Sequence, residues 1–294
     1  MSDAALAQTG LHPARTLPVH RSRLLATLPG IVHGLTGRVP GLGDADGNVG
    51  YSPPRDGNDA WEMRQKWSAA IGVDPESIVT AGQVHGTTVL HVTAAQAGRG
   101  GRPRTPRLGL ADALITDEPG LALMTLHADC VPILLVDPQR PAIAAVHAGW
   151  RGTVNDIAGA TLLAMQRAFG SQPANIVAYL GPAIGACCYQ VGADVAAAWQ
   201  PLAAAMPDDV LQRDGERWRF NLHAANRALL LRAGVPASQI ERSAICTCCA
   251  ADDWFSHRGQ GSATGRFGAV IALGEPPAPA PKRQADRHGS QDGR

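Results

Sequence analysis

Two short apolar runs near the middle of the chain constrain its fold more than any other feature. Val131–Val136 and Ala142–Val146 are rich in aliphatic and β-branched residues, and the turn signal Asp137-Pro138 stands between them. Runs of this length bounded by turn residues predict buried strands. A tight turn over Asp137–Pro141 makes the two strands antiparallel, so their outer ends lie side by side.

A reactive side chain stands at the outer end of each predicted strand. Cys130 precedes the first strand and His147 follows the second, so we expect them to be neighbours although they are 17 positions apart. Directly after His147 comes Ala-Gly-Trp-Arg-Gly-Thr, and then a helical pattern. A glycine-flanked strand-to-helix turn presents free backbone N–H groups that favour an anion. The sequence therefore predicts a chemical centre at this edge of the sheet.

The rest of the chain alternates short strands with helices and shows no internal repeat, which predicts one α/β domain with mixed sheets. Further strands are expected at Ile31–Arg38, Ser77–Ala81, Thr87–Val92, Ala111–Thr116, Leu121–Leu126, Ile176–Leu180, Ser243–Thr247 and Phe267–Leu273. Helices are expected at Ala60–Ile71, capped by Asn58 or Asp59, and at Asn155–Phe169, Asp194–Met206 and Leu222–Ala233.

Length and composition are sufficient for a single large core. The chain has 294 residues, of which 45% are hydrophobic. We expect residues 1–28 to be poorly structured and residues 29–274 to form the domain. Residues 275–294 are Pro-rich and then polar, so they are predicted to be a disordered tail.

Charge and hydropathy limit which partners the protein can bind and where in the cell it is expected. The formal net charge of +1 supplies no general argument for binding nucleic acid or membranes. The basic loop Gly98–Arg107 lacks the interleaved aromatic residues of a nucleic-acid site, and we expect it to be a mobile insertion. Residues 1–30 lack an apolar core of signal-peptide length, and no run approaches the roughly 18 apolar residues of a membrane span. These features predict a cytoplasmic protein whose six cysteines remain reduced.

A third side chain can join the predicted centre. His85 stands in Gln83-Val-His-Gly86 between two predicted strands, where glycine lets the backbone turn at a site. His85, Cys130 and His147 together offer nitrogen, sulfur and nitrogen donors, which suit zinc, and three protein ligands leave a fourth position open as in catalytic sites. The residues alone leave two alternatives open: a buried thiol with hydrogen-bonded histidines, and a metal-free Cys/His pair.

The five remaining cysteines form two short groups, Cys187-Cys188 and Cys246-Thr-Cys-Cys249. The second group contains a Cys-x-x-Cys spacing, so a structural zinc site is conceivable. Adjacent cysteines chelate one ion poorly, however, and cysteine usually behaves as a small buried hydrophobe. The pattern favours that simpler interpretation.

An ordered series of motifs between Gly34 and Leu273 resembles one family. This family was once called multicopper polyphenol oxidases or laccase-domain proteins. Its members are identified as zinc-dependent purine nucleoside phosphorylases. The family also includes peptidoglycan editing factor-like proteins. The motifs are Gln83-Val-His-Gly86, Ala111-Asp-Ala, Ala128-Asp-Cys-Val-Pro-Ile-Leu-Leu135, His147-Ala-Gly-Trp-Arg-Gly152, Gly181-Pro-Ala-Ile-Gly185, Cys188-Tyr-Gln-Val-Gly192, Cys246-Thr247, Phe255-Ser256 and Thr264-Gly-Arg266.

The resemblance implies a fold and an activity. The fold is a layered α/β/β/α sandwich that resembles the catalytic domain of cytotoxic necrotising factor toxins. Zinc, or copper as the alternative, is held by His85, Cys130 and His147. The implied reactions are phosphorolysis of adenosine, inosine, guanosine and methylthioadenosine to the free base and ribose-1-phosphate, together with adenosine deamination.

Further site residues follow from this chemistry. Asp129, next to a zinc ligand, is expected to shuttle protons or to orient that ligand. Arginines are the side chains of choice for phosphate because the guanidinium fork is bidentate and always charged. The candidates for phosphate and ribose contacts, each with a structural salt bridge or turn role as the alternative, are Arg38, Arg64, Arg151, Arg266 and Asn48.

Other functions remain open alternatives. Cys130 as nucleophile and His147 as its base would make a thiol hydrolase or deamidase. A copper-dependent polyphenol oxidase, an enzyme that edits peptidoglycan precursors, and a non-catalytic zinc-stapled module are further possibilities. His127, His257 and Gly259 depart from the family pattern and bear on substrate preference. The expected oligomeric state is a monomer or homodimer.

Overall fold

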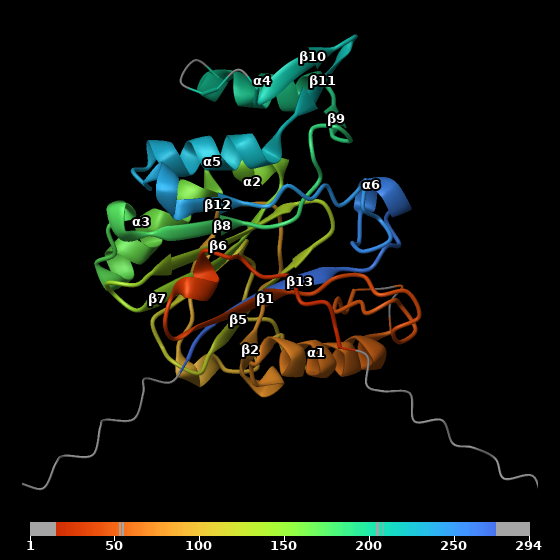
Figure 1. Ribbon diagram of the computed structural model, residues 1–294, viewed down its shortest axis with the longest axis vertical. Helices are drawn as coiled ribbons and strands as arrows, with labels where there is room; N and C mark the ends of the chain where they lie inside the picture. Colours follow the sequence, from red (N-terminus) through yellow and green to blue (C-terminus); the bar gives the residue numbers. More distant parts are fainter. Residues whose placement is uncertain (1–15, 53, 55, 204–205, 208, 275–294) are drawn as a thin grey trace, which may run out of the picture.

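The computed structural model describes residues 16–274 except residues 53, 55, 204–205 and 208. Two sheets stack face to face and helices cover their outer faces, so the layers run helix, sheet, sheet, helix (Figure 1). The upper helices are α2 (Trp150–Val154), α3 (Ile157–Phe169) and α5 (Leu222–Arg232), and the lower one is α1 (Gly57–Ile71). This arrangement confirms the expected single α/β domain of mixed sheets in α/β/β/α layers. The likeness to the necrotising factor domain stays a prediction.

The central hairpin forms as expected. β6 (Val131–Asp137) pairs antiparallel with β7 (Ala142–Ala148), and Val131 lies opposite Ala148. Both strands are buried along their whole length because helices cover one face of their sheet and the second sheet covers the other. Burial on both faces explains why the two runs are continuously apolar rather than alternating.

Mixed pairing characterises both large sheets. The six-stranded sheet has the order β12 (Ile240–Arg242), β8 (Val177–Leu180), β6, β7, β4 (Ala113–Thr116), β3 (Val89–His91), and the outer pairs β12–β8 and β3–β4 are parallel. The four-stranded sheet has the order β1 (Ile31–Leu35), β13 (Phe267–Leu273), β5 (Ala122–His127), β2 (Ile78–Val79), with β2 parallel to β5. A core of fully buried side chains joins the sheets, among them Leu123, Leu134, Ile143, Ala145, Ala269 and Ile271.

The helix boundaries correct two expectations. α1 begins after Asp56, whose carboxylate accepts the N–H groups of Asn58 and Asp59, so neither of these two residues is the cap. The single helix expected over Asn155–Phe169 is in fact α2 followed by α3. They separate because Asp156 adopts left-handed backbone (φ 58°) and caps α3 by accepting the Gly159 N–H.

One small sheet was missed and one predicted strand is wrong. β9 (Gln190–Val191), β10 (Leu211–Asp214) and β11 (Arg217–Phe220) form a separate three-stranded sheet next to α4 (Ala193–Ala203). These strands are short and mostly polar, so no apolar pattern marks them. Ser243–Thr247 is not a strand; the strand at this point is β12, and Cys246 makes only an isolated bridge with Ala183.

The segment from residue 16 to residue 28, expected to be poorly structured, is packed on the domain. Leu25 is fully buried. The Glu241 carboxylate of β12 accepts the Ser22 hydroxyl and the N–H groups of Arg23 and Leu24. Residues 1–15 and the expected tail 275–294 lie outside the described residues.

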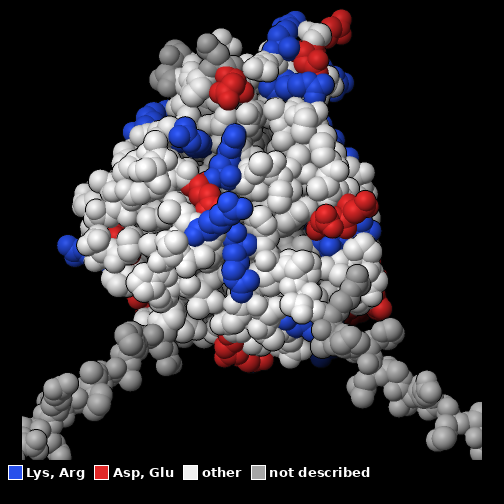
Figure 2. Space-filling view, viewed as in Figure 1, with Lys and Arg blue, Asp and Glu red and all other residues white. Residues whose placement is uncertain are grey.

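The surface carries no broad basic area on the face in view. Lys and Arg side chains gather there in a narrow column beside an acidic group (Figure 2). Within the described part of the chain, none of the helices has both the length and the apolar character needed to cross a bilayer.

A buried histidine predicts a pH-dependent stability. Burial lowers the pKa of His223 from 6.5 to about 4, although its hydrogen bond to the Gly181 carbonyl opposes this. Stability is therefore full above pH 6.5 and falls as the pH approaches 4, because only the unfolded chain takes up the proton. Between pH 7.5 and pH 4.5, His223→Gln, which can still donate to Gly181, should lose roughly 2–3 kcal/mol less unfolding free energy than wild type. Urea unfolding at both pH values measures this; equal losses would contradict it.

Candidate metal centre

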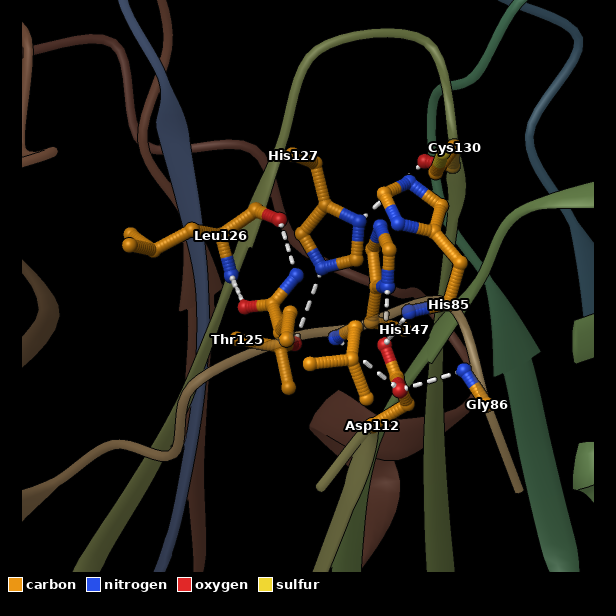
Figure 3. A network of polar contacts seen from close by, with 10 residues as sticks. His85, Gly86, Asp112, Thr125, Leu126, His127, Cys130 and His147 are labelled. Atoms are coloured by element: carbon orange, nitrogen blue, oxygen red, sulfur yellow. Dashed lines mark hydrogen bonds and ion pairs between the residues drawn. The ribbon is translucent and has the colours of Figure 1, made fainter. Parts of the chain in front are cut away.

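Three side chains distant in sequence meet at one edge of the six-stranded sheet. Cys130 directly precedes β6, His147 belongs to β7, and His85 lies in the loop between β2 and β3. Their potential ligand atoms all lie within 4.8 Å of one another. The His85 and His147 rings meet edge to face, 4.9 Å between centroids (Figure 3). The expected convergence is confirmed.

One buried carboxylate, that of Asp112, positions both histidines. Its Oδ1 accepts a hydrogen bond from His147 Nδ1 at 2.8 Å. The same carboxylate accepts the backbone N–H groups of Val84, His85 and Gly86 at 3.2, 3.0 and 2.7 Å (Figure 3). The bond to Nδ1 leaves His147 Nε2 as the nitrogen able to bind a metal. Sequence reasoning missed this role, although Asp112 stands in one of the family motifs.

The loop that carries His85 is held in an unusual conformation. His85 has left-handed backbone (φ 61°), which is unfavourable for a residue with a Cβ. The three N–H bonds to Asp112 compensate locally. In addition, the Gln83 side chain donates to the Leu126 carbonyl and accepts the Leu126 N–H, both at 2.7 Å, which fastens the loop to β5.

Glycine at position 149 keeps one side of the centre clear. A Cβ there would lie 2.8 Å from His85 Cδ2 and 3.0 Å from Cys130 Sγ. Both distances are too short for any side chain without displacing the two groups. Gly149 therefore allows the backbone to pass directly beside the candidate ligands.

Cys130 and His147 shift each other's pKa. Burial raises the pKa of Cys130, but the charge of His147 and hydrogen bonds from His147 and His85 outweigh it and bring this pKa down to about 6. Burial lowers the pKa of His147, but the Cys130 charge and the Asp112 hydrogen bond raise it to about 9. The two shifts describe a thiolate paired with an imidazolium. A metal bound at His147 Nε2 would take the place of the imidazolium proton, and thiolate with neutral imidazole is a donor set that fits zinc.

Asp129 lies beside the centre with both carboxylate oxygens engaged. Oδ1 accepts the Thr247 hydroxyl and Oδ2 accepts the Arg258 N–H, each at 2.7 Å. Asp129 also has left-handed backbone (φ 87°). These contacts support a positioning role for Asp129 more than a proton shuttle.

A cavity of about 520 Å³ opens over the three side chains, the size range of small-molecule sites. Among the described residues that line it, Asp129 is the only carboxylate. The positively charged side chains in its lining are Arg64, Arg107, Arg151, Arg258 and Arg266. The cavity is therefore suited to an anion next to a metal centre.

Two sequence-based candidates lie outside this cavity. Arg38 forms an ion pair with Asp46 at 2.8 Å and donates to the Ala251 carbonyl. Asn48 is buried, and its side chain bonds to the backbone of Gly50 and Arg266. Bonds to nearby residues therefore hold both side chains away from the cavity. Asn48 has the structural turn role that was the alternative for it. Arg64, Arg151 and Arg266 do line the cavity as expected.

Several lining residues were not predicted. Arg107 reaches the cavity from the Gly98–Arg107 loop, which was expected to be a mobile insertion. That loop is instead anchored, because Arg64 donates to the carbonyls of Gly100 and Gly101. Arg258 and the tyrosines Tyr51 and Tyr189 were also missed. Tyr189 stands in the family motif Cys188-Tyr-Gln-Val-Gly192, which could have pointed to it, whereas none of the motifs contains Tyr51.

The residues that depart from the family pattern lie at different distances from the cavity. His257 lines the cavity, and the Gly259 N–H donates to the Ser256 hydroxyl at the start of α6 (His257–Gln260). His127 does not line it. Its ring is buried behind His147, accepts the Thr125 hydroxyl and donates to the Cys130 carbonyl, and burial holds its pKa well below the usual value.

Fold and site together define a class: a layered α/β protein with two histidines and a cysteine beneath an arginine-lined cavity. The chain belongs to the family described as multi-copper polyphenol oxidoreductase laccase, which it matches over residues 33–274.

Relatives with names and a solved structure support this membership. A purine nucleoside phosphorylase from Bacteroides thetaiotaomicron is 36% identical over 253 residues, 85% of this chain and 94% of that protein. Adenosine deaminase RL5, from an unknown prokaryotic organism, is 35% identical over 232 residues, 76% of this chain and 88% of that protein. The crystal structure of YlmD from Geobacillus stearothermophilus matches with a TM-score of 0.80 at 34% identity, covering 86% of this chain and 94% of that one.

Replacement of Asp112 tests the positioning role. Asp112→Asn removes the charge that orients His147 and holds the His85 loop, so the zinc affinity should fall about 10- to 100-fold. Competition with a chromophoric chelator measures it. Asp137→Asn is the matched control, since Asp137 is equally buried but lies at the far end of β6 and β7 and bonds only to the N–H groups of Gln139 and Arg140. An Asp112→Asn protein that binds zinc like the control would contradict the role.

Proposed function

We propose that this protein is a zinc-dependent purine nucleoside phosphorylase that also deaminates adenosine. Adenosine, inosine, guanosine and methylthioadenosine are the proposed substrates, with phosphate as the second one and the free base and ribose-1-phosphate as products. The observation that carries the proposal is the arginine-lined cavity directly over His85, Cys130 and His147. The names of the two relatives, a phosphorylase and an adenosine deaminase, support it.

The protein's own residues would prepare the reaction. His85, Cys130 and His147 would hold the zinc ion, which supplies Lewis-acid chemistry when bound. Asp112 keeps the His147 proton on Nδ1 and so directs Nε2 to the centre. Asp129 holds the segment that brings His257 and Arg258 to the cavity wall.

Phosphate binding falls to the arginines. Arg107 and Arg151 line the cavity, and among the described residues neither forms an ion pair with a carboxylate. The Arg151 guanidinium stacks on the Trp150 ring at 4.3 Å, which orients it. Arg64 bonds to three backbone carbonyls, and although burial lowers its pKa to about 10 it keeps its charge at neutral pH. Arg107 and Arg151 are therefore the proposed clamp, while Arg64 supports the rim.

Two alternatives fit less well. A thiol hydrolase would use Cys130 and His147 alone. His85, however, also lies close enough to share a metal ion with the Cys130 sulfur, and a metal-bound thiolate loses its nucleophilicity.

A multi-copper oxidase needs several histidine-rich sites. In the described ranges only one other potential ligand cluster is found, and it consists of cysteines. Peptidoglycan-precursor editing remains an alternative with the same centre.

The setting of the reaction is also a proposal. We place the enzyme in the cytoplasm, where the cysteine ligands stay reduced. The proposed catalytic domain takes in residues 29–274 together with the packed segment from residue 16. A monomer or homodimer is the proposed assembly.

Incubation with adenosine tests the proposal directly. With phosphate, zinc-loaded protein should release adenine and ribose-1-phosphate; without phosphate it should form inosine. Cys130→Ser should abolish both products, because the sulfur ligand is lost. Chromatography of the products measures the outcome, and zinc-replete protein that makes none of these products would overturn the proposal.

Arginine variants test the phosphate clamp. Arg107→Gln and Arg151→Gln should each raise the KM for phosphate about 10- to 100-fold, since a charge-assisted hydrogen bond contributes about 1.5–3 kcal/mol. Arg38→Gln is the control, because Arg38 pairs with Asp46 away from the cavity, and its KM should not change. Equal KM values in all three variants would contradict the assignment.

A further inference from the structure

Four cysteines outside the candidate centre lie together. Cys187 and Cys188 belong to the loop between β8 and β9, and Cys246 and Cys249 to the segment between β12 and α6. These two segments run side by side toward α6 (Figure 1). All four sulfurs lie within 4.8 Å of one another, and Cys249 Sγ is 3.6 Å from Cys187 Sγ and 3.3 Å from Cys188 Sγ.

This cluster corrects the view of these residues as small buried hydrophobes. Cys187 and Cys249 are exposed, and all of these cysteines are free thiols. Cys188 and Cys246 pack partly against the core, but hydrophobic packing does not account for the exposed sulfurs of Cys187 and Cys249 joining them. The adjacent pair Cys187-Cys188 directs both sulfurs to the same side, so their adjacency does not prevent joint binding.

The backbone around the cluster forms a built site. Ala183 and Cys246 make a parallel bridge, which fixes the two segments against each other. The Gly185 N–H donates to Cys246 Sγ at 3.2 Å, an interaction that stabilises a thiolate. A Cβ at Gly185 would lie 3.1 Å from Cys187 Sγ and 3.2 Å from Cys246 Cβ, so the absence of a side chain lets the segments approach.

Two arginines hold the backbone of the adjacent cysteines. Arg219 donates to the carbonyl of Cys187, and Arg258 donates to the carbonyl of Cys188 at 3.1 Å. Four thiolates around a divalent ion carry a net charge of about −2, which the Arg258 guanidinium would partly balance, whereas that of Arg219 is paired with Asp214.

We propose that Cys187, Cys188, Cys246 and Cys249 bind one structural zinc ion. Zinc–sulfur bonds of about 2.3 Å in a tetrahedron place the sulfurs about 3.8 Å apart, close to the spacing already present. Four protein ligands leave no open position, so this zinc is structural rather than catalytic. Soft thiolate ligands in this geometry select zinc over hard cations such as magnesium.

The second zinc would stabilise one wall of the cavity. One of its loops carries Tyr189, and the other leads to His257 and Arg258; all three line the cavity. Thr247, between two of the ligands, donates to Asp129, the neighbour of Cys130. The site would thus add a metal link to the backbone bonds that already join the two loops, from Ala183 N–H to the Ile245 carbonyl and from Thr247 N–H to the Ala183 carbonyl.

Metal stoichiometry tests this proposal independently of activity. Wild-type protein purified under reducing conditions with zinc should hold two zinc ions per chain by elemental analysis. Cys249→Ser and Cys246→Ser should each lose one of them. Cys248→Ser is the matched control and should keep both, because Cys248 neighbours the cluster but is not part of it.

A variant without the catalytic centre separates the two sites. His85→Ala with His147→Ala should keep one zinc, and Co²⁺ in its place should show a thiolate-to-cobalt charge-transfer band that Cys249→Ser removes. If the double variant does not fold, the loss of one zinc by Cys249→Ser alone still decides the question. Failure of nucleoside turnover would leave these counts unchanged, so the two proposals fail separately.

Three results would overturn the second site. One is wild-type protein with at most one zinc ion whose four cysteines alkylate fully in excess zinc. Another is a disulfide among them, seen as a loss of two hydrogens in the intact mass, with no second metal. The third is iron bound in place of zinc.

Discussion

The buried carboxylate of Asp112 is the constraint on which the centre depends. It accepts one imidazole N–H and three consecutive backbone N–H groups, so it orients His147 and holds the His85 loop at once. Burial alone raises the pKa of Asp112, but these bonds more than offset that and keep the group ionised. Four donors therefore make an otherwise unfavourable buried charge stable, and that charge preorganises two of the three ligands.

The remaining parts of the site follow a division between sheet and loops. β6 and β7 are fully buried, and Cys130 and His147 stand together at one end of this hairpin. Loops and helices supply the cavity walls, and three of the five arginines, Arg64, Arg151 and Arg258, lie in α1, α2 and α6. The proposed second zinc lies where two of these loops meet, outside the strands of the sheet. Because two of the candidate metal ligands stand at the hairpin and the cavity wall is held by other segments, residues of the wall can change without displacing these ligands.

Features caused by residues close together in the sequence could be predicted, and features caused by residues far apart in the sequence could not. Continuous apolar runs and a turn signal sufficed for β6 and β7, and antiparallel pairing then brought Cys130 near His147. Asp112 was missed because its partners stand 26 to 35 positions away along the chain. Arg38 follows the salt-bridge alternative that was left open for it, because its guanidinium pairs with Asp46, and the sequence alone does not reveal that pairing. The four-cysteine cluster was undervalued because two separate loops create it.

Anomalous X-ray diffraction at the zinc edge tests the central claim most directly. A crystal of the zinc-loaded protein should show a peak about 2.0–2.1 Å from one nitrogen each of His85 and His147 and about 2.3 Å from Cys130 Sγ. Asp112 should remain bonded to His147 Nδ1. No peak between these three side chains, or an imidazole turned away from the sulfur, would contradict the account.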